Sequence, residues 1–316
     1  MGVTRARRSA PAPAPLFPTR HRGLRDQLRR LASAADSANT VLVLGAAGTG
    51  KDRLARLLHE RSRRAAEPFV RVDLAAVSDD LFESELFGHE RGAFTGAVAP
   101  KAGLLEGARG GTLYLDRIDA LSLRAQGKLL RVVEERLVRR VGGTRQAPLG
   151  ARLVASAGPD LPRKARSGEF REDLFYRLAV VTVTLPPLAE RKEDLLPAAR
   201  AVARAAGGPA AFTPSARALL LAHGWRGNFR ELENVVRRAA ASAAAAKADA
   251  IDAHDLRLAG PSDPHALLGA ALHAGWSLRE LTDAYIRLVL EDSGGNVAEA
   301  ARRLGIARKT LYGRRG

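Results

Sequence analysis

The sequence has 316 residues, 51 Lys and Arg against 34 Asp and Glu, a formal net charge of +17 and no cysteine. This length suits about two domains, and the lack of cysteine excludes disulfides, thiolate catalysis and Cys-ligated metal sites. The basic excess indicates a polyanionic partner such as nucleic acid or nucleotide phosphate. Because no apolar run approaches the ~18 residues of a membrane span, and the N-terminus lacks the apolar core of a signal peptide, we expect a cytoplasmic protein without membrane contact.

The first part of the chain alternates between strand and helix patterns. Residues 1–20 are rich in Arg, Ala and Pro and predict a disordered basic tail, with auxiliary DNA contact as the alternative. Leucines at helical spacing predict a helix over residues 23–35. Apolar runs predict strands over residues 41–44, 69–72, 112–115, 152–155 and 180–185, with helices between them, notably over 125–138. The expected fold class is α/β, a parallel sheet with helices on both faces, over residues 21–188.

The pattern after Pro186-Pro187 becomes all helical. A helical domain is expected over residues 189–258, with helices at 195–206, 214–223 and 228–248. Gly and Pro in residues 259–276 predict a linker. Short helices close the chain in a domain over residues 277–316.

A phosphate-binding loop is predicted between the first strand and the helix that follows it. Gly45-Ala46-Ala47-Gly48-Thr49-Gly50-Lys51 fits G-x-x-x-x-G-K in that structural context. The glycines let backbone N–H groups turn toward phosphate oxygens, the helix start adds partial positive charge, and Lys51 reaches the outer phosphates. Asp52 stands where the general motif has a magnesium-binding Ser or Thr. A Gly-rich turn without a ligand is the alternative.

An acidic residue ends the third predicted strand. Asp116 follows Thr112-Leu113-Tyr114-Leu115, where a phosphate-loop enzyme holds its magnesium. We therefore expect Asp116 to bind Mg²⁺; the alternative is a solvated carboxylate at a strand end.

A longer stretch is far more specific. Residues 83–97 read ESELFGHERGAFTGA, with an intact core at Gly92-Ala93-Phe94-Thr95-Gly96-Ala97. This stretch resembles the signature of the sigma-54-dependent transcriptional activators, bacterial enhancer-binding proteins of the NtrC-like AAA+ class. Further blocks of that family follow in order: GGTLYLD at 110–116, FREDLFYRL at 170–178, LPPL at 185–188 and WRGNFRELEN at 225–234. The resemblance covers residues 22–258, which implies an AAA+ P-loop fold with a helical lid, and resumes at 278–312.

The resemblance implies a nucleotide-driven ring. In this family a ring, usually a hexamer, uses ATP hydrolysis to remodel the closed complex of sigma-54 RNA polymerase at a promoter. By resemblance Gly92–Ala97 contact sigma-54, with Phe94 as an apolar anchor; a Phe94 packed into the core is the alternative. Arg171 and Arg177 match the arginine fingers and, with Asp116, are the candidate catalytic residues. Arg230 matches the second-sensor arginine. Without the family context these three arginines would be read as surface salt-bridge residues. The implied cofactors are ATP and Mg²⁺.

The C-terminal domain resembles the Fis-type helix-turn-helix of the same family. Leu281, Ile286 and Leu290 mark one helix, and Asn296 is expected to cap a second helix that Gly305 ends. Residues 307–312 would begin a recognition helix for double-stranded DNA upstream of promoters. Its candidate DNA-binding residues are Arg308, Lys309, Thr310 and Tyr312. Since residues 1–20 alone precede the AAA+ module, we expect no receiver domain, and either constitutive action or control by a partner.

Several positions depart from the family pattern. Arg117 replaces the Glu that polarises the attacking water, Asp73 replaces the Asn that restrains it, and Ala157-Gly158 replaces the polar first sensor. Asp52 for Glu is a milder change, and Ala189 replaces an Arg. Because an arginine cannot accept a proton, we hypothesise that ATP binds and is hydrolysed slowly or not at all. The complementary charges predict an Asp73–Arg117 ion pair.

Two functions remain open from the sequence. One is an ATP-driven sigma-54 activator that binds upstream DNA. The other is a hydrolysis-defective pseudo-ATPase that acts as a DNA-bound repressor or joins mixed rings. General AAA+ remodelling or helicase loading is disfavoured by the intact block at Gly92–Ala97.

Overall fold

The computed structural model describes residues 18–33, 39–258, 276–293, 296–307 and 311. The chain forms two compact units. The first comprises residues 1–194 and 225–232, and the second comprises residues 195–224 and 233–316. Of the described helices, none combines the length and apolarity that crossing a membrane requires.

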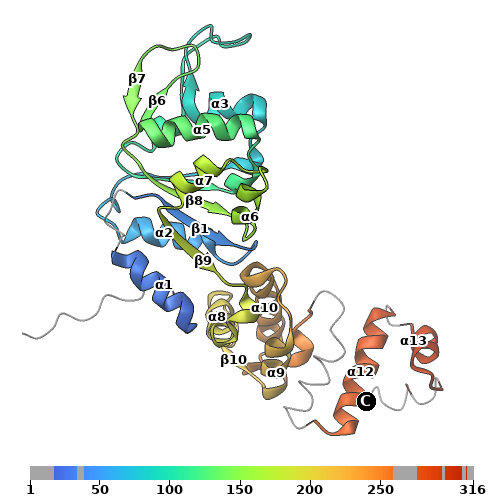
Figure 1. Ribbon diagram of the computed structural model, residues 1–316. Helices are drawn as coiled ribbons and strands as arrows, with labels where there is room; N and C mark the ends of the chain where they lie inside the picture. Colours follow the sequence, from blue (N-terminus) through green and yellow to red (C-terminus); the bar gives the residue numbers. More distant parts are fainter. Residues whose placement is uncertain (1–17, 34–38, 259–275, 294–295, 308–310, 312–316) are drawn as a thin grey trace, which may run out of the picture. The chain divides into compact units, whose positions relative to one another are not determined.

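A five-stranded, wholly parallel sheet forms the centre of the first unit (Figure 1). Its strands are β1 (Val41–Gly45), β2 (Phe69–Asp73), β5 (Thr112–Asp116), β8 (Arg152–Ala157) and β9 (Val181–Leu185). The strand order is β2-β5-β8-β1-β9, and each strand coincides with one predicted from the sequence. Every residue of β1, β5 and β8 is buried, as expected of a sheet covered on both faces. The α/β fold class is confirmed.

Two layers of helices cover the sheet. One face packs against α1 (Arg22–Ser33) and α2 (Lys51–Glu60), and the other against α3 (Asp79–Phe87), α5 (Leu123–Glu135), α6 (Leu161–Arg166) and α7 (Glu172–Leu178). Figure 1 shows α5 and α7 on one side of the sheet and α1 and α2 on the other. Side chains alternate along each strand: Val41 and Val43 face α1 and α2, whereas Leu42 and Leu44 join the opposite cluster.

Two short hairpins and several single turns complete the first unit. β3 (Gly88–His89) pairs with β4 (Lys101–Ala102), and β6 (Leu137–Arg139) pairs with β7 (Gln146–Pro148), both antiparallel. The turns are α4 (Leu104–Gly107), η1 (Leu74–Ala76), η2 (Ile118–Ala120) and η3 (Leu188–Glu190). The helix predicted over residues 125–138 ends earlier, because Arg136 adopts a left-handed φ of 55° and closes α5. Leu137 and Val138 therefore belong to a strand.

Two residues that the sequence assigns to the tail are described by the structure and are hydrogen-bonded. Residues 1–17 lie outside the described residues, but Thr19 and Arg20 both donate hydrogen bonds to the carboxylate of Asp194. His21 Nδ1 then accepts a hydrogen bond from Leu24 N at 3.1 Å at the start of α1. Thr19 and Arg20 are thus part of the packed chain.

The second unit is mainly helical. It contains most of α8 (Lys192–Ala205) and α10 (Asn228–Ala245), together with α9 (Pro214–Ala222), η4 (Ala253–Asp255), α12 (Leu278–Asp292) and α13 (Val297–Leu304). The expectation of an all-helical segment after Pro187 is wrong at one place. β10 (Ala211–Phe212) and β11 (Ala250–Ile251) form a parallel pair, and two-residue strands are too short to produce a recognisable alternation.

Candidate nucleotide site and sigma-54 loop

The predicted phosphate-binding loop joins β1 to α2. It comprises Gly45, Ala46, Ala47, Gly48, Thr49, Gly50 and Lys51. Thr49 Oγ1 donates to Ala46 O at 2.8 Å, and Lys51 Nζ donates to Gly45 O and Ala46 O at 2.6 and 3.1 Å. The loop thus curls at the start of a ten-residue helix, where backbone N–H groups and the helix dipole favour an anion. Asp52 is exposed in the first turn of α2.

A segment far along the sequence supports this loop. Asn228 is buried, and its Nδ2 donates to Ala47 O at 2.9 Å across 181 positions of sequence. Its Oδ1 accepts from Leu188 N at 2.7 Å, and Phe229 N donates to Gly48 O at 3.0 Å. One buried amide therefore joins the phosphate loop to the turn after β9.

Two arginines lie beside the same loop. Arg191 is fully buried, its Nη2 donates to Thr49 O at 2.7 Å, and its Cζ lies 4.6 Å from the centroid of the Phe229 ring. Burial lowers the pKa of Arg191 to about 10, against the charge of Asp194. Arg230, the candidate second-sensor residue, is exposed. Its Cβ lies 3.4 Å from the position that a Cβ on Gly48 would take. The structure therefore places Arg230 at the predicted loop.

The carboxylate of Asp116 is held by three neighbours at the end of β5. Ser156 Oγ and Tyr114 OH donate to its Oδ1 at 2.5 and 3.0 Å, and Arg71 Nη2 lies 2.7 Å from its Oδ2. Burial raises the pKa of Asp116, but the hydrogen bonds from Ser156, Arg71 and Tyr114 outweigh that effect and hold the pKa below its ordinary value. Burial lowers the pKa of Lys51, and the charge of Asp116 opposes that shift. Asp116 and the phosphate loop therefore belong to one electrostatic site.

The predicted ion pair between Asp73 and Arg117 is confirmed. Arg117 Nε donates to Asp73 Oδ1 at 2.9 Å, and Nη2 contacts both carboxylate oxygens. Asp73 and Asp116 are register partners on the parallel strands β2 and β5, so Arg117 reaches across from one strand end to the next. The position that the family gives to a catalytic Glu is thus occupied by a guanidinium already bound to an acid.

The first-sensor position carries no side chain, and two acidic side chains lie close to it. Gly158 N donates to Asp119 Oδ2 at 3.2 Å. A Cβ at Gly158 would lie 2.6 Å from Asp160 Oδ1 and 3.1 Å from Asp119 Oδ2. A sensor side chain therefore has no room unless Asp160 moves.

These residues do not fit a magnesium site of the expected kind. Mg²⁺ binds through carboxylate, phosphate and water oxygens, whereas both oxygens of Asp116 already accept hydrogen bonds and one of them faces the cationic Arg71. The guanidinium of Arg71 already supplies a positive charge beside Asp116.

The predicted sigma-54 loop, Gly92–Ala97, lies between β3 and β4. Gly92 N donates to Ala97 O at 2.9 Å, and Ala97 N donates to Phe94 O at 3.0 Å, so the segment Gly92, Ala93, Phe94, Thr95, Gly96 and Ala97 closes into a turn. Phe94 is 47% exposed, with its ring 4.9 Å from the ring of His89. The alternative of a core-packed Phe94 is wrong: this aromatic ring stands at the surface.

The second hairpin braces that loop. Val141 N donates to Gly88 O at 2.9 Å and Glu90 N donates to Val141 O at 3.0 Å. Arg140 forms two 2.7 Å hydrogen bonds with Glu106 and one of 3.3 Å with Glu90. The loop is therefore fixed at its base while Phe94 projects from it.

The two candidate arginine fingers lie on or beside α7. Arg171 pairs with Asp173 at 2.7 Å and Arg177 with Glu134 at 3.7 Å, and their side chains are 43% and 55% exposed. Arg171 N also donates to the buried Gln126 at 2.7 Å. Within the first unit both guanidiniums thus form surface ion pairs, and neither is brought near the phosphate loop by a contact among the described residues.

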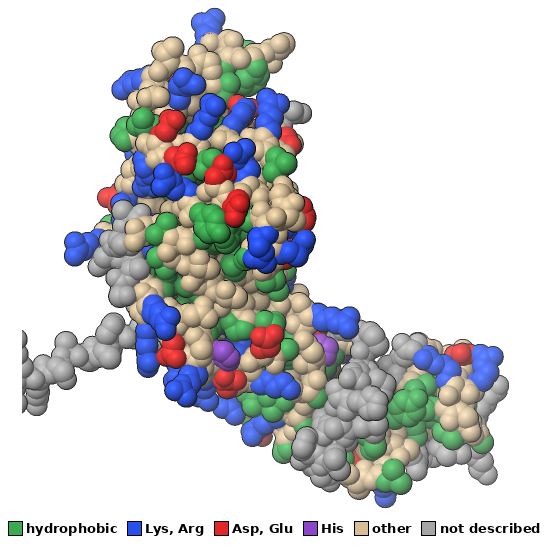
Figure 2. Space-filling model, viewed as in Figure 1, with side chains coloured by type: hydrophobic (Ala, Val, Ile, Leu, Met, Phe, Trp, Pro, Cys, Tyr) green, Lys and Arg blue, Asp and Glu red, His purple; other side chains and the backbone are tan. Residues whose placement is uncertain are grey.

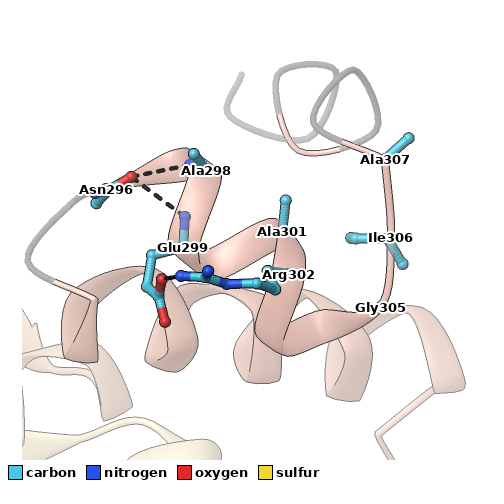
Figure 3. A pocket seen from close by; sticks show the side chains of 8 residues that line it. All are labelled: Asn296, Ala298, Glu299, Ala301, Arg302, Gly305, Ile306 and Ala307. Atoms are coloured by element: carbon cyan, nitrogen blue, oxygen red, sulfur yellow. Dashed lines mark hydrogen bonds and ion pairs between the residues drawn. The ribbon is translucent and has the colours of Figure 1, made fainter.

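The C-terminal helices match the predicted helix-turn-helix. Asn296 Oδ1 accepts from Ala298 N and Glu299 N at 3.1 and 3.2 Å and caps α13, which Gly305 ends with a left-handed φ of 66°. The cap lies beside an open hollow of about 550 Å³, and Figure 3 shows the side chains that line it. Ile286, Val289, Ala300, Ala301 and Leu311 form a common buried cluster. The candidate DNA-binding residues Arg308, Lys309, Thr310 and Tyr312 lie outside the described residues.

The basic excess is not gathered into one patch on the visible face of the first unit. Figure 2 shows Lys and Arg side chains there interspersed with Asp and Glu. Several basic side chains of the first unit form ion pairs, such as Lys101 with Glu85 at 2.6 Å. That face alone does not mark a polyanion-binding surface.

Sequence reasoning did not single out four residues that hold the nucleotide site together. These are Arg71, Ser156, Arg191 and Asn228. Asn228 lies within one of the quoted family blocks and Arg191 closely follows another, so their sequence context was a usable signal. Arg71 could be found only through strand register, because it is the partner of Tyr114 in the ladder between β2 and β5.

Models of known families match three parts of the chain. A sigma-54 interaction domain matches residues 18–184, an AAA+ ATPase lid domain residues 189–263, and a bacterial regulatory protein domain of the Fis family residues 277–315. The AAA+ lid and the helix-turn-helix expected from the sequence are thus both shown.

Individual relatives point the same way. The chain is 43% identical over 296 residues to the transcriptional regulatory protein ZraR of Klebsiella oxytoca, covering 91% of this chain and 66% of that protein. It is 46% identical over 236 residues to the sigma54-dependent transcriptional activator SfnR of Pseudomonas putida, covering 73% and 64%. The crystal structure of NtrX from Brucella abortus in complex with ATP is 30% identical, with a TM-score of 0.68, and covers 94% of this chain and 68% of that one. The chain thus spans about two thirds of the length of these relatives, and it belongs to the family of proteins with a sigma-54 interaction domain, here joined to an AAA+ lid and a Fis-family helix-turn-helix.

Proposed function

We propose that this chain regulates sigma-54-dependent transcription. ATP binds at the loop Gly45–Lys51, the loop Gly92–Ala97 contacts sigma-54 RNA polymerase, and the C-terminal helices bind double-stranded DNA upstream of promoters. Family membership supports the sigma-54 and DNA partners, and the likeness to NtrX crystallised with ATP supports the nucleotide.

The observation that carries this proposal is the braced and exposed sigma-54 loop. Phe94 is half exposed at the tip of a segment whose base is held by Arg140 and by backbone hydrogen bonds. An exposed aromatic ring on a fixed scaffold is a typical anchor for a protein partner. The exposed part of the Phe94 side chain adds nothing to folding, and contact with a partner explains why it is apolar.

Capture of sigma-54 tests the proposal. The full chain, incubated with purified sigma-54 and either ATP, ADP or a non-hydrolysable ATP analogue, is expected to co-elute with it in at least one nucleotide state. Phe94→Ala is expected to abolish co-elution, whereas Val98→Ala, at another exposed apolar residue just beyond the loop, is expected to keep it. Equal capture by both variants, or no capture in any state, would contradict the proposed contact.

A second candidate, a hydrolysis-defective ATPase, is favoured by the Arg117–Asp73 pair. Arg117 holds no proton-accepting group and is bound to Asp73, while Gly158 leaves no first-sensor side chain. The phosphate loop and its supports are intact by contrast. This combination supports nucleotide binding without rapid turnover, in a chain that acts as a DNA-bound repressor or in mixed rings.

We propose that Arg171, Arg177 and Arg230 keep their family roles in a hexameric ring. Because both candidate fingers are exposed, a neighbouring subunit can receive them even if this chain does not hydrolyse ATP. Mixing the chain with a catalytically active family member is then expected to change that partner's ATPase rate. The change should vanish in Arg171→Ala and Arg177→Ala and persist in Arg163→Ala, which removes an exposed arginine elsewhere. An unchanged rate, or an effect that persists without the fingers, would exclude a mixed ring of this kind.

A further inference from the structure

Two ion pairs connect β2 and β5 at their carboxyl ends. Arg71 is in register with Tyr114, and Asp73 is in register with Asp116. Arg71 Nη2 lies 2.7 Å from Asp116 Oδ2 on the neighbouring strand, while Arg117 Nε lies 2.9 Å from Asp73 Oδ1 in the opposite direction. Each acid is thus paired with an arginine from the other strand.

This arrangement is electrically balanced without a metal. Two carboxylates side by side repel each other and call for a counter-cation, which a divalent ion ordinarily supplies beside bound phosphates. Here the guanidiniums of Arg71 and Arg117 supply the two positive charges. A Mg²⁺ ion at Asp116 would have to displace Arg71 or lie against its like charge.

The side chain of Arg71 is also open to solvent. Its side chain is 46% exposed while it contacts Asp116. A guanidinium has five N–H donors and binds phosphate oxygens well, so one edge can remain on Asp116 while another faces solvent. Lys51 belongs to the same site, because the negative charge of Asp116 raises its pKa against the effect of burial. Lysine and arginine together can neutralise a di- or triphosphate directly.

We propose that Arg71 takes the place of the divalent cation, so that this chain binds nucleoside di- and triphosphates independently of Mg²⁺. The inference rests on the proposed binding of ATP at the phosphate loop. The ligand is the nucleotide anion without a bound metal ion. Arg71 binds its phosphates, and Asp116 holds Arg71 in place.

Equilibrium binding of ADP and ATP, each in excess Mg²⁺ and in EDTA, tests the proposal. The purified full chain is expected to bind with dissociation constants that agree within about threefold between the two conditions. In Arg71→Ala, Asp116 loses its counter-charge, so affinity in EDTA is expected to fall at least about tenfold below that in Mg²⁺. Arg71→Gln keeps a hydrogen-bond donor but no charge, so its nucleotide affinity should likewise fall in EDTA relative to Mg²⁺. Arg131→Ala, at an exposed position of α5, should behave like the parent chain, and circular dichroism verifies the fold of each variant.

The outcomes separate this inference from the proposed function. Nucleotide binding that weakens more than about tenfold in EDTA in the parent chain overturns the inference and leaves nucleotide binding standing. Variants at Arg71 that bind as the parent does in both conditions also overturn it. A folded parent chain that binds neither nucleotide in either condition contradicts the proposed function, and the inference falls with it.

Discussion

The guanidinium of Arg117 is bound to the carboxylate of Asp73, with Nε and Oδ1 2.9 Å apart. Each residue alone is a departure from the family pattern, and together they form one interaction that replaces an Asn and a Glu. The exchange keeps two polar side chains in contact at adjacent strand ends. It removes the carboxylate from position 117 and leaves the new carboxylate of Asp73 bound to a guanidinium. The Asp73–Arg117 ion pair is therefore expected to affect both the stability of the fold and the rate of ATP hydrolysis.

Coupling between these two residues is expected to be measurable but small. About half of the Arg117 side chain is exposed, and exposed ion pairs contribute about 0.2–1 kcal/mol. A double-mutant cycle of Asp73→Asn, Arg117→Gln and the double variant, followed by denaturant unfolding, should give a coupling energy in that range. Arg117→Glu alone should destabilise more than Arg117→Gln, because it brings a third carboxylate beside Asp73 and Asp116. Additive effects of the two substitutions would show that the pair does not form in solution.

Removal of the Asn228 amide is expected to loosen the phosphate loop. Asn228→Ala takes away the donor to the exposed Ala47 O and the acceptor for the buried Leu188 N, and one unpaired buried group costs about 1–3 kcal/mol. We expect lower thermal stability and weaker ATP binding by calorimetry. Asn234→Ala, at an exposed position of α10, should change neither. Normal affinity in Asn228→Ala would mean that the loop holds its shape without this support.

A methyl group at Gly142 is expected to displace the sigma-54 loop. A Cβ there would lie 2.8 Å from the Cβ of Ala93. Gly142→Ala should therefore reduce sigma-54 capture. Gly168→Ala is a matched control, because Gly168 has a similar left-handed φ, 77° against 75°, and nothing within 4 Å of the added carbon. Both variants bear the same backbone strain, of about 1 kcal/mol, so only Gly142→Ala should affect capture. Equal loss in both would assign the effect to strain alone.

The Arg140–Glu106 ion pair at the base of the sigma-54 loop is expected to weaken in acid. Hydrogen bonding from Arg140 lowers the pKa of Glu106 below its ordinary value of 4.5. The pair therefore stabilises the fold fully above pH 4.5 and loses that contribution as pH falls through the lower folded pKa. Glu106→Gln should melt at a lower temperature than the parent chain at pH 7, and the difference should shrink toward pH 4 and below. A difference that is constant with pH would show that the charge of Glu106 is not involved.

The sequence sufficed for features that depend on local pattern. The five central strands are short apolar runs, and the phosphate loop lies between a strand and a helix, so neighbouring residues define both. The cap by Asn296 and the end at Gly305 were likewise predictable, because capping involves residues only a few positions apart. Even the Arg117–Asp73 pair could be predicted, because the two departures from the family pattern introduce opposite charges.

Contacts that depend on tertiary packing could not be predicted from the sequence. Arg71 meets Asp116 only because β2 and β5 pair in one particular register. Asn228 and Arg191 support a loop more than 100 residues away in sequence, which no local periodicity encodes. The early end of α5 depends on a left-handed Arg136, a conformation that residue type alone does not predict.

Hydrolysis of ATP by the parent chain shows whether Arg117 and Asp73 suppress turnover. With saturating radiolabelled ATP and Mg²⁺, and the protein concentrated enough to assemble, bound ATP is expected to be recovered intact, with turnover far below ~1 per second. The variant Asp73→Asn/Arg117→Glu, which restores the family residues at both positions, should hydrolyse measurably faster. Turnover by the parent chain at about 1 per second or above, unchanged in that variant, would show that the exchange does not suppress hydrolysis.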